Sequence, residues 1–145
     1  MLKLFIPIYD NTYPMVTPIS SPCPCGSTRP YDACCMPLHQ GAAAATAEAL
    51  MRSRYSAYVL GLEDYLLATW HADTRPAALD LGAEPKAKWL GLEVKRHELL
   101  GHNEAQVEFI ARYKVGGRAH RLYETSRFQR IEGRWYYVDG EFPTR

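Results

Sequence analysis

Residues 105–139 decide the fold, and their sequence is AQVEFIARYKV-GG-RAHRLYETSRFQRI-EG-RWYYVD. Apolar and polar side chains alternate along much of this stretch, and this is the period of a strand that buries one face. The dipeptides Gly116-Gly117 and Glu132-Gly133 have the composition of tight hairpin turns. The stretch therefore predicts three antiparallel strands, at about residues 105–115, 119–131 and 135–139.

The sequence before this stretch predicts another strand, at about residues 90–100, and several helices. Residues 47–60 have a helical pattern that ends near a glycine, and Thr46 is a suitable N-cap. A second helix is predicted for about residues 63–70, and the alanines and leucines of residues 76–85 suggest a third, short one. Helices followed by an antiparallel meander make an α+β fold, in which about four strands curve round the helices.

The concave face of such a sheet encloses either packed side chains or a pocket. In the strand at 119–131, alternate side chains share one face, and their mixed polarity would suit a pocket if that face is the concave one. The sequence leaves the choice of face open. The side chains of this face are His120, Leu122, Glu124, Ser126 and Phe128.

The bulk composition excludes some classes of partner. The chain has 145 residues and a net charge of +1, so no general attraction to nucleic acid or to an anionic membrane is expected. Residues 1–20 predict a flexible leader, because their apolar start is interrupted by Pro7 and is too short to span a membrane or to act as a signal peptide. Without an export signal, and with reduced thiols, the expected location is the cytoplasm.

All four cysteines lie between Cys23 and Cys35, in the run Cys23-Pro-Cys25-Gly-Ser-Thr-Arg-Pro-Tyr-Asp-Ala-Cys34-Cys35. Two close pairs joined by a short loop can enclose a tetrahedral zinc ion, and a site closed by four protein ligands is structural. A Cys-x-Cys pair and a vicinal pair are each poorly placed for an unstrained disulfide, although a bridge between an early and a late cysteine stays open. The sequence therefore predicts a zinc site, with disulfides or free thiols as the alternatives.

The residues between the cysteines support the metal site. Gly26 can adopt a positive φ and turn backbone N–H groups toward the first two sulfurs. Ser27 and Pro30 suggest the start of a short helix that would bring Cys34 and Cys35 back to the ion. Arg29 could offset the negative charge of the thiolates. His39 could do the same, but an ordinary solvated histidine is the simpler expectation.

These residues resemble a known motif. The run Cys23-Pro-Cys25-Gly26-Ser27, then Tyr31, then Cys34-Cys35, resembles the SEC-C zinc motif, best known from the C-terminal tail of the secretion ATPase SecA. The chain after about residue 22 also looks like the YchJ family. The segments that carry this second resemblance are Met51-Arg-Ser-Arg-Tyr-Ser-Ala-Tyr58, Asp64-Tyr-Leu, Thr69-Trp-His71, Trp89-Leu-Gly-Leu, Ser126-Arg-Phe128 and Gly133-Arg-Trp-Tyr-Tyr-Val-Asp-Gly140.

The resemblance implies a division of the chain. The YchJ family joins an N-terminal SEC-C motif to a nuclear-transport-factor-2-like, or cystatin-like, domain, whose sheet forms a cone. Here the leader would be residues 1–20, the SEC-C zinc knuckle residues 21–40, and the cone residues 41–145. The family has no established biochemical activity, so the resemblance implies a structural zinc ion but no reaction.

Several residues of the cone are candidates for a ligand pocket. Arg52, Tyr55 and Tyr58 are spaced three apart on the first helix, and one guanidinium with two phenols could bind an anion or a planar ligand. The same residues could instead form a structural network, with Glu108 or Glu124 as the partner of the arginine. Tryptophans are core residues by default but can line a ligand site. The pocket candidates are Arg52, Tyr55, Tyr58, Trp89 and Glu124.

Catalysis is the less expected function. Asp64, His71 and Tyr55 are the candidates for acid-base work, since folds of this shape can hold such groups in a deep cup. A histidine at a helix end is more often a partner of the helix dipole. No pair of nucleophile and base and no open metal site is visible in the sequence.

Two classes of function follow. The first is a zinc-stabilised binding or adaptor module for a protein partner, with Arg29, Tyr31 and residues 36–38 as part of the contact. The alternative is a small-molecule-binding protein or enzyme that uses the concave pocket, which requires a cavity rather than a filled interior. Nucleic-acid binding through the zinc knuckle is weaker, because Arg29 is the only cation between its cysteines.

Overall fold

The computed structural model describes residues 21–143, so the leader predicted for residues 1–20 lies outside the described residues. The predicted α+β fold is confirmed: helices precede a four-stranded antiparallel sheet. In order, the elements are the 3-10 turn η2 (Tyr31–Ala33), the helices α1 (Met36–His39), α2 (Ala47–Leu60) and α3 (Glu63–Ala68), and the strands β1 (Lys88–Gly101), β2 (Glu104–Val115), β3 (Arg118–Ile131) and β4 (Arg134–Glu141).

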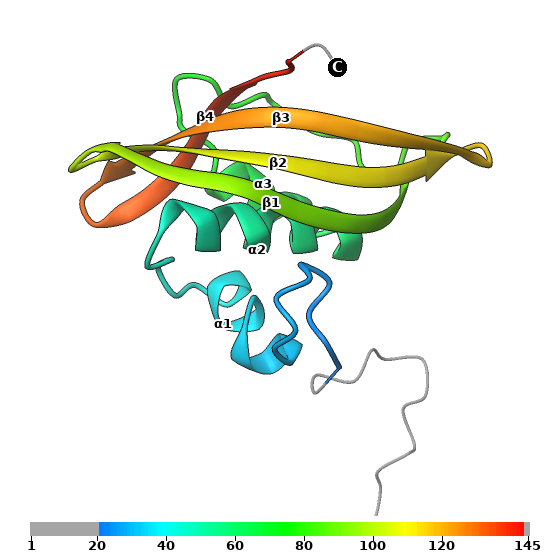
Figure 1. Ribbon diagram of the computed structural model, residues 1–145, viewed down its shortest axis with the longest axis horizontal. Helices are drawn as coiled ribbons and strands as arrows, with labels where there is room; N and C mark the ends of the chain where they lie inside the picture. Colours follow the sequence, from blue (N-terminus) through cyan, green and yellow to red (C-terminus); the bar gives the residue numbers. More distant parts are fainter. Residues whose placement is uncertain (1–20, 144–145) are drawn as a thin grey trace, which may run out of the picture.

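The central helix α2 begins and ends as the sequence predicts. The Thr46 hydroxyl accepts a hydrogen bond from the Ala49 N–H at 3.0 Å, so it satisfies one of the free donors of the first turn. Gly61 stops the helix in the left-handed conformation, at φ 75°. Figure 1 shows the sheet curving over one side of α2 while residues 21–40 lie against the other side. Helix α2 is therefore a middle layer.

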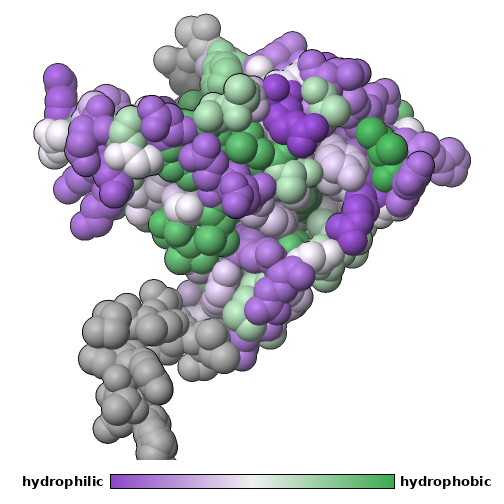
Figure 2. Space-filling model, turned by 180° about the vertical axis from the view of Figure 1, so that it is seen from behind, coloured by the Kyte–Doolittle hydropathy of each residue, from purple (hydrophilic) through white to green (hydrophobic). Residues whose placement is uncertain are grey.

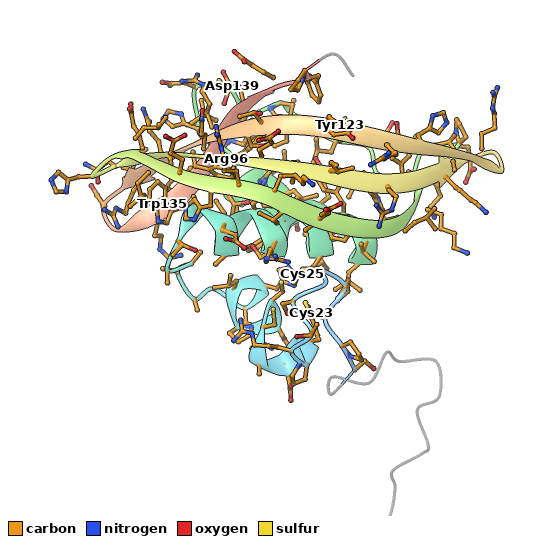
Figure 3. The ribbon with its side chains drawn as sticks, viewed as in Figure 1. Cys23, Cys25, Arg96, Tyr123, Trp135 and Asp139 are labelled. Atoms are coloured by element: carbon orange, nitrogen blue, oxygen red, sulfur yellow. The ribbon has the colours of Figure 1, made fainter. Side chains whose placement is uncertain are left out.

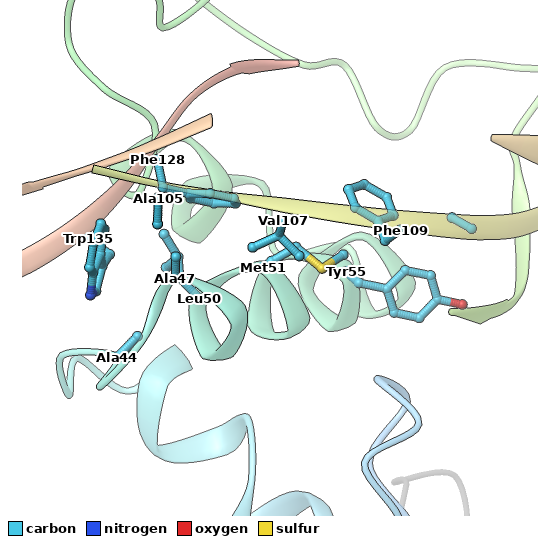
Figure 4. Packing of buried hydrophobic residues seen from close by; sticks show 11 residues of the cluster. Ala44, Ala47, Leu50, Met51, Tyr55, Ala105, Val107, Phe109, Phe128 and Trp135 are labelled. Atoms are coloured by element: carbon cyan, nitrogen blue, oxygen red, sulfur yellow. The ribbon is translucent and has the colours of Figure 1, made fainter. Parts of the chain in front are cut away.

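The sheet is a simple meander with the order β1-β2-β3-β4. Gly116 and Gly117 both have positive φ and close the β2–β3 hairpin at the predicted place. The concave face packs on α2, and Figure 4 shows Val107 and Phe109 of β2 pointing toward Met51 and Tyr55. This contact is the main hydrophobic core.

The structure decides which face of β3 is concave. Leu122, Glu124, Ser126 and Phe128 point toward α2. His120 belongs to the same face by parity, but it is exposed beside the β2–β3 hairpin, where its ring stacks on Tyr113 with a centroid distance of 5.2 Å. Polar groups of β3 thus enter the interior of the cone.

The predicted third helix at residues 76–85 is wrong. Within the described part of the chain, this segment consists of turns and extended backbone. The backbone N–H groups of Leu79 and Leu81 donate to the Glu63 carboxylate at 3.0 and 3.3 Å, so they are not used for helical hydrogen bonds. The contact with Glu63 thus outweighs the helix propensity of the alanines and leucines.

The surface mixes polar and apolar residues. Figure 2 shows hydrophobic residues toward the middle of the rear face, with hydrophilic residues around them. The most exposed large hydrophobic side chains are Leu99 of β1 and Phe142 after β4, at 65% and 62%. Among the described residues, no helix combines the length and apolar composition needed to cross a membrane.

Candidate functional site

The four cysteines form a compact cluster. Their sulfur atoms all lie within 4.8 Å of one another, with 3.6 Å between Cys25 and Cys34 and 3.9 Å between Cys34 and Cys35. A tetrahedral site with metal–sulfur bonds of about 2.3 Å separates its sulfurs by about 3.8 Å. All four thiols are free, and the sulfurs are too far apart for a disulfide. The cluster can therefore hold a metal ion.

Backbone hydrogen bonds between residues close in the sequence build this cluster. The Cys23 N–H donates to the Arg29 carbonyl at 2.9 Å and the Gly26 N–H to the Cys23 carbonyl at 3.1 Å, and Gly26 has the predicted positive φ, 81°. The short helix expected from Ser27 and Pro30 is instead broken in two, because η2 ends before Cys34 and α1 begins after Cys35. This interruption turns both of the later sulfurs toward Cys23 and Cys25.

Within the cluster, the neighbouring thiols favour ionisation of Cys23. Hydrogen bonds from Cys25 and Cys35 stabilise the ionised Cys23 and lower its pKa to about 3. The Cys35 thiol then donates toward the Cys23 sulfur, which raises the pKa of Cys35, as do Cys25 and burial. A divalent cation would remove this conflict, because it would stabilise all four sulfurs in the thiolate form.

His39 has a structural role that the sequence did not suggest. Its Nε2 lies 2.8 Å from the Ser53 carbonyl oxygen of α2, so Nε2 carries the proton and donates. Its Nδ1 lies 2.7 Å from the Tyr31 hydroxyl, which must then be the donor. Burial lowers the pKa of His39, consistent with a neutral ring. The expected solvated histidine is wrong: His39 joins the cysteine-containing segment, residues 21–40, to α2.

Arg52 also joins the knuckle to α2. Its guanidinium donates to the Cys25 carbonyl at 2.9 Å and to the Glu48 carboxylate at 3.0 Å. Nearby, the Ser56 hydroxyl lies 3.5 Å from the Cys23 sulfur and 3.4 Å from that of Cys35. Figure 3 shows Cys23 and Cys25 on the side of α2 that faces away from the sheet. Arg52, predicted for the pocket, instead lies against the cysteine cluster.

Helix geometry explains this displacement. An α-helix turns by about 100° per residue, so two successive steps of three residues leave Arg52 and Tyr58 about 120° apart. Residues Met51, Arg54, Tyr55 and Tyr58 fall on the face toward the sheet. Arg52 lies close to Tyr55 on the helix surface and Tyr55 lies close to Tyr58, but the angular offset grows over the two steps. Arg54 rather than Arg52 therefore faces the sheet.

The other pocket candidates lie together. Tyr55, Tyr58, Trp89 and Glu124 all line a cavity of about 230 Å³ between α2 and the concave face of the sheet. Edge-to-face and tilted contacts join the Trp89 ring to Tyr55 and Tyr58, with centroid distances of 5.8 and 5.7 Å. The complete lining is Met51, Arg54, Tyr55, Tyr58, Trp70, Trp89, Phe109, Ala111, Leu122, Glu124, Ser126, Phe128 and Tyr137. We call this space the cavity.

Arg54 is a charged residue of the cavity that the sequence did not predict there. It is 6% exposed, and one guanidinium nitrogen donates to the Leu66 carbonyl and the Thr69 hydroxyl, both at 2.7 Å. The guanidinium carbon lies 4.9 Å from the ring centre of Trp70 and 4.6 Å from that of Tyr137. Burial lowers the pKa of Arg54. Its position one turn before Tyr58 was the available signal.

Glu124 is the buried carboxylate of the cavity, at 8% exposed. Its Oε2 accepts hydrogen bonds from the Ser126 hydroxyl at 2.7 Å and from the Tyr137 hydroxyl at 3.0 Å. Burial and the nearby Glu124 charge raise the pKa of Tyr137, so the phenol stays protonated and donates. Gly140 makes room for this arrangement, because a Cβ there would lie 2.0 Å from Oε2.

The three acid-base candidates are not brought together. Tyr55 lines the cavity, whereas Asp64 is exposed and lines a separate groove with Tyr65 and Arg134. His71 lies after α3, where its Nδ1 accepts a hydrogen bond from the Asp73 N–H at 3.0 Å. Their chemistry therefore cannot combine at one point. Trp135, the remaining tryptophan, is buried in the core.

Comparison with known proteins gives matches to both parts of the chain. Residues 46–140 match the family model of the middle, nuclear-transport-factor-2-like domain of YchJ, and residues 20–37 match the SEC-C motif. A UPF0225 protein of Methylibium petroleiphilum is 60% identical over 123 residues, which are 83% of this chain and 88% of that protein.

Two solved structures are also similar. A SEC-C motif containing protein from Rhodopseudomonas palustris superposes with a TM-score of 0.77 and 37% identity, over 86% of this chain and 100% of that one. Another, from Psychrobacter arcticus, gives a TM-score of 0.73 and 33% identity, over 89% of this chain and 87% of that one.

Proposed function

Since this chain belongs to the UPF0225 family, in which a SEC-C motif precedes a YchJ-like domain, we propose that it is a small-molecule-binding protein braced by a structural zinc ion. The observation that carries the proposal is the cavity. Side chains could have filled the interior of the cone, but about 230 Å³ remains open between α2 and the sheet. An aromatic lining with a few converging polar groups is typical of ligand sites.

Zinc is the metal that best suits the cysteine cluster. Four thiolates in a tetrahedron are the usual donor set of structural zinc, and no position stays open for a substrate. Cys23, Cys25 and Cys35 are buried, so the ion would be shielded from water. His39, Arg52 and Ser56 fasten the cluster to α2, on the side opposite the cavity. The ion would therefore hold one wall of the ligand site in place.

The proposal predicts that filling the cavity abolishes ligand binding. Leu122 is half-buried at the lining, and Leu122→Trp would place an indole in the open space. In a screen of one- and two-ring aromatic fragments, we expect chemical-shift changes at the cavity residues of the unaltered chain, and affinities about tenfold weaker or worse in the variant. Nuclear magnetic resonance titration measures both.

Leu90→Trp is the matched control, because Leu90 is 46% exposed on β1 and does not line the cavity. It should leave fragment binding unchanged. Fragments that shift only residues outside the cavity, or that bind Leu122→Trp as well as the unaltered chain, would contradict the proposal.

A second candidate function is recognition of a protein partner beside the zinc knuckle. A groove of about 230 Å³ lies there, and its lining includes Ser27, Arg29, Leu38 and Arg52. Arg29 is exposed, whereas the Tyr31 hydroxyl is engaged by His39. This groove supports a contact centred on Arg29 rather than on Tyr31.

We expect Arg29→Glu to release a partner that copurifies with the chain, because the substitution reverses the charge at the rim of this groove. Arg118→Glu in the β2–β3 hairpin is the control, since Arg118 is exposed far from the cysteines. Quantitative mass spectrometry of the copurified proteins compares the two. Equal retention by both variants would remove this candidate.

A further inference from the structure

Two buried charged groups, Arg54 and Glu124, line the cavity. Arg54 donates to Leu66 and Thr69 from one guanidinium nitrogen, and its flat guanidinium lies against the Trp70 and Tyr137 rings. These contacts hold α2, α3 and β4 together. Because a positive and a negative group both line the cavity, their charges offset each other, and an uncharged ligand disturbs neither.

Glu124 is satisfied on one side only. The two hydroxyls that donate to its carboxylate, from Ser126 and Tyr137, both reach the same oxygen, Oε2. No donor to Oε1 is found among the described residues, and Glu124 lines the cavity with a side chain that is 8% exposed. Oε1 can therefore accept a hydrogen bond from a ligand, and hydrogen bonds to charged groups are the strong ones.

Most of the remaining lining is aromatic. Trp89 and Tyr58 lie on one side of the cavity and Phe128 and Tyr137 on another, and the last two rings meet edge to face at 5.8 Å. Aromatic walls favour a planar ligand through offset stacking and edge contacts. A volume of about 230 Å³ equals roughly eight water molecules of about 30 Å³ each, which is room for one or two small rings.

From these observations, and resting on the small-molecule binding proposed above, we propose that the cavity takes a small, planar, uncharged aromatic or heteroaromatic molecule whose N–H or O–H group donates a hydrogen bond to Oε1 of Glu124. The carboxylate fixes the orientation of the ligand, and the aromatic walls supply most of the apolar contact. Arg54 holds the Tyr137 ring, whose hydroxyl donates to Glu124.

The matched probes for this proposal are indole and N-methylindole, which have the same ring system but differ in the N–H donor. Both are uncharged, so the comparison isolates the hydrogen bond. Benzoate is the third probe, because it offers an acceptor and a negative charge instead. Affinities are measured by nuclear magnetic resonance titration of the metal-loaded chain. We expect indole to bind at least about tenfold more tightly than N-methylindole, and benzoate to bind more weakly than indole.

Variants of the carboxylate test the same contact from the protein side. Glu124→Gln keeps the shape but removes the charge, and it should reduce the affinity for indole by about tenfold or more while leaving N-methylindole unaffected. Gly140→Ala keeps the carboxylate but displaces it, since the new Cβ would lie 2.0 Å from Oε2, and it should have the same effect. Glu93→Gln is the control, because Glu93 is exposed on β1.

The outcomes separate the two proposals. If none of the probes binds in the cavity, the small-molecule function itself fails. If indole and N-methylindole bind in the cavity with equal affinity and Glu124→Gln changes neither, the function stands and the donor requirement is wrong. Tighter binding of benzoate than of indole would also overturn it, because Arg54 would then be the group that selects the ligand.

Discussion

Removal of the metal ion from the cysteine cluster is expected to destabilise the whole described chain, not only residues 21–40. Metal binding contributes free energy to folding because the site does not exist in the unfolded chain. The cluster contacts α2 through the Cys25 carbonyl and through two sulfurs beside Ser56, so its collapse would also loosen the central helix. We expect chelation or Cys25→Ser to cost about 4 kcal/mol, or about 10–15 °C in the thermal midpoint for a chain of this length.

Differential scanning calorimetry and elemental analysis measure this effect together. One zinc ion per chain is expected before chelation, and its return should restore the midpoint. Thr28→Ala is the control variant, because Thr28 is exposed between the cysteine pairs. A midpoint that changes by less than about 3 °C after complete metal loss would mean that the cluster does not brace α2.

Replacement of Arg54 by alanine is expected to have an effect of similar size for a different reason. The substitution removes two hydrogen bonds from a charged donor and leaves the Leu66 carbonyl and the Thr69 hydroxyl without that partner. It also removes the contacts of the guanidinium with the Trp70 and Tyr137 rings. Hydrogen bonds to charged groups contribute about 1.5–3 kcal/mol each, so the loss of two predicts a decrease of about 3–6 kcal/mol in the free energy of unfolding.

Urea unfolding of the metal-loaded chain checks this prediction. Arg54→Lys is the informative companion, since an ammonium keeps the charge but lacks the planar fork that lies against both rings, and it should recover less than half of the loss. Arg75→Ala is the control, because Arg75 is exposed with a single long hydrogen bond of 3.4 Å to the Leu67 carbonyl. Equal stability of Arg54→Ala and Arg75→Ala would show that the buried guanidinium contributes nothing.

The features that could be predicted from the sequence are those set by neighbouring residues. The cysteines form their cluster within a short run, Thr46 and Gly61 limit α2 by their own backbone preferences, and the two hairpin dipeptides fix the meander. The alternation of the strands then gives the α+β fold. Each of these signals depends on residues that are close in the sequence.

The features that could not be predicted depend on distant contacts. The segment at 76–85 is bound by Glu63, and His39 is held by Ser53. Arg54 and Arg52 are two residues apart on one helix, but only tertiary packing decides which of them meets the sheet. The open interior of the cone likewise depends on how side chains from α2 and four strands meet, and no local pattern encodes the volume they leave.

Helix α2 is covered on two opposite sides, which limits how the chain can be divided. Met51 and Tyr55 are buried against the sheet, while Ser53 and Ser56 are buried against the knuckle. A fragment starting at Thr46 would keep all four strands. It would, however, expose to water the side of α2 that the knuckle covers in the whole chain. We therefore expect the two stretches that match family models to unfold together.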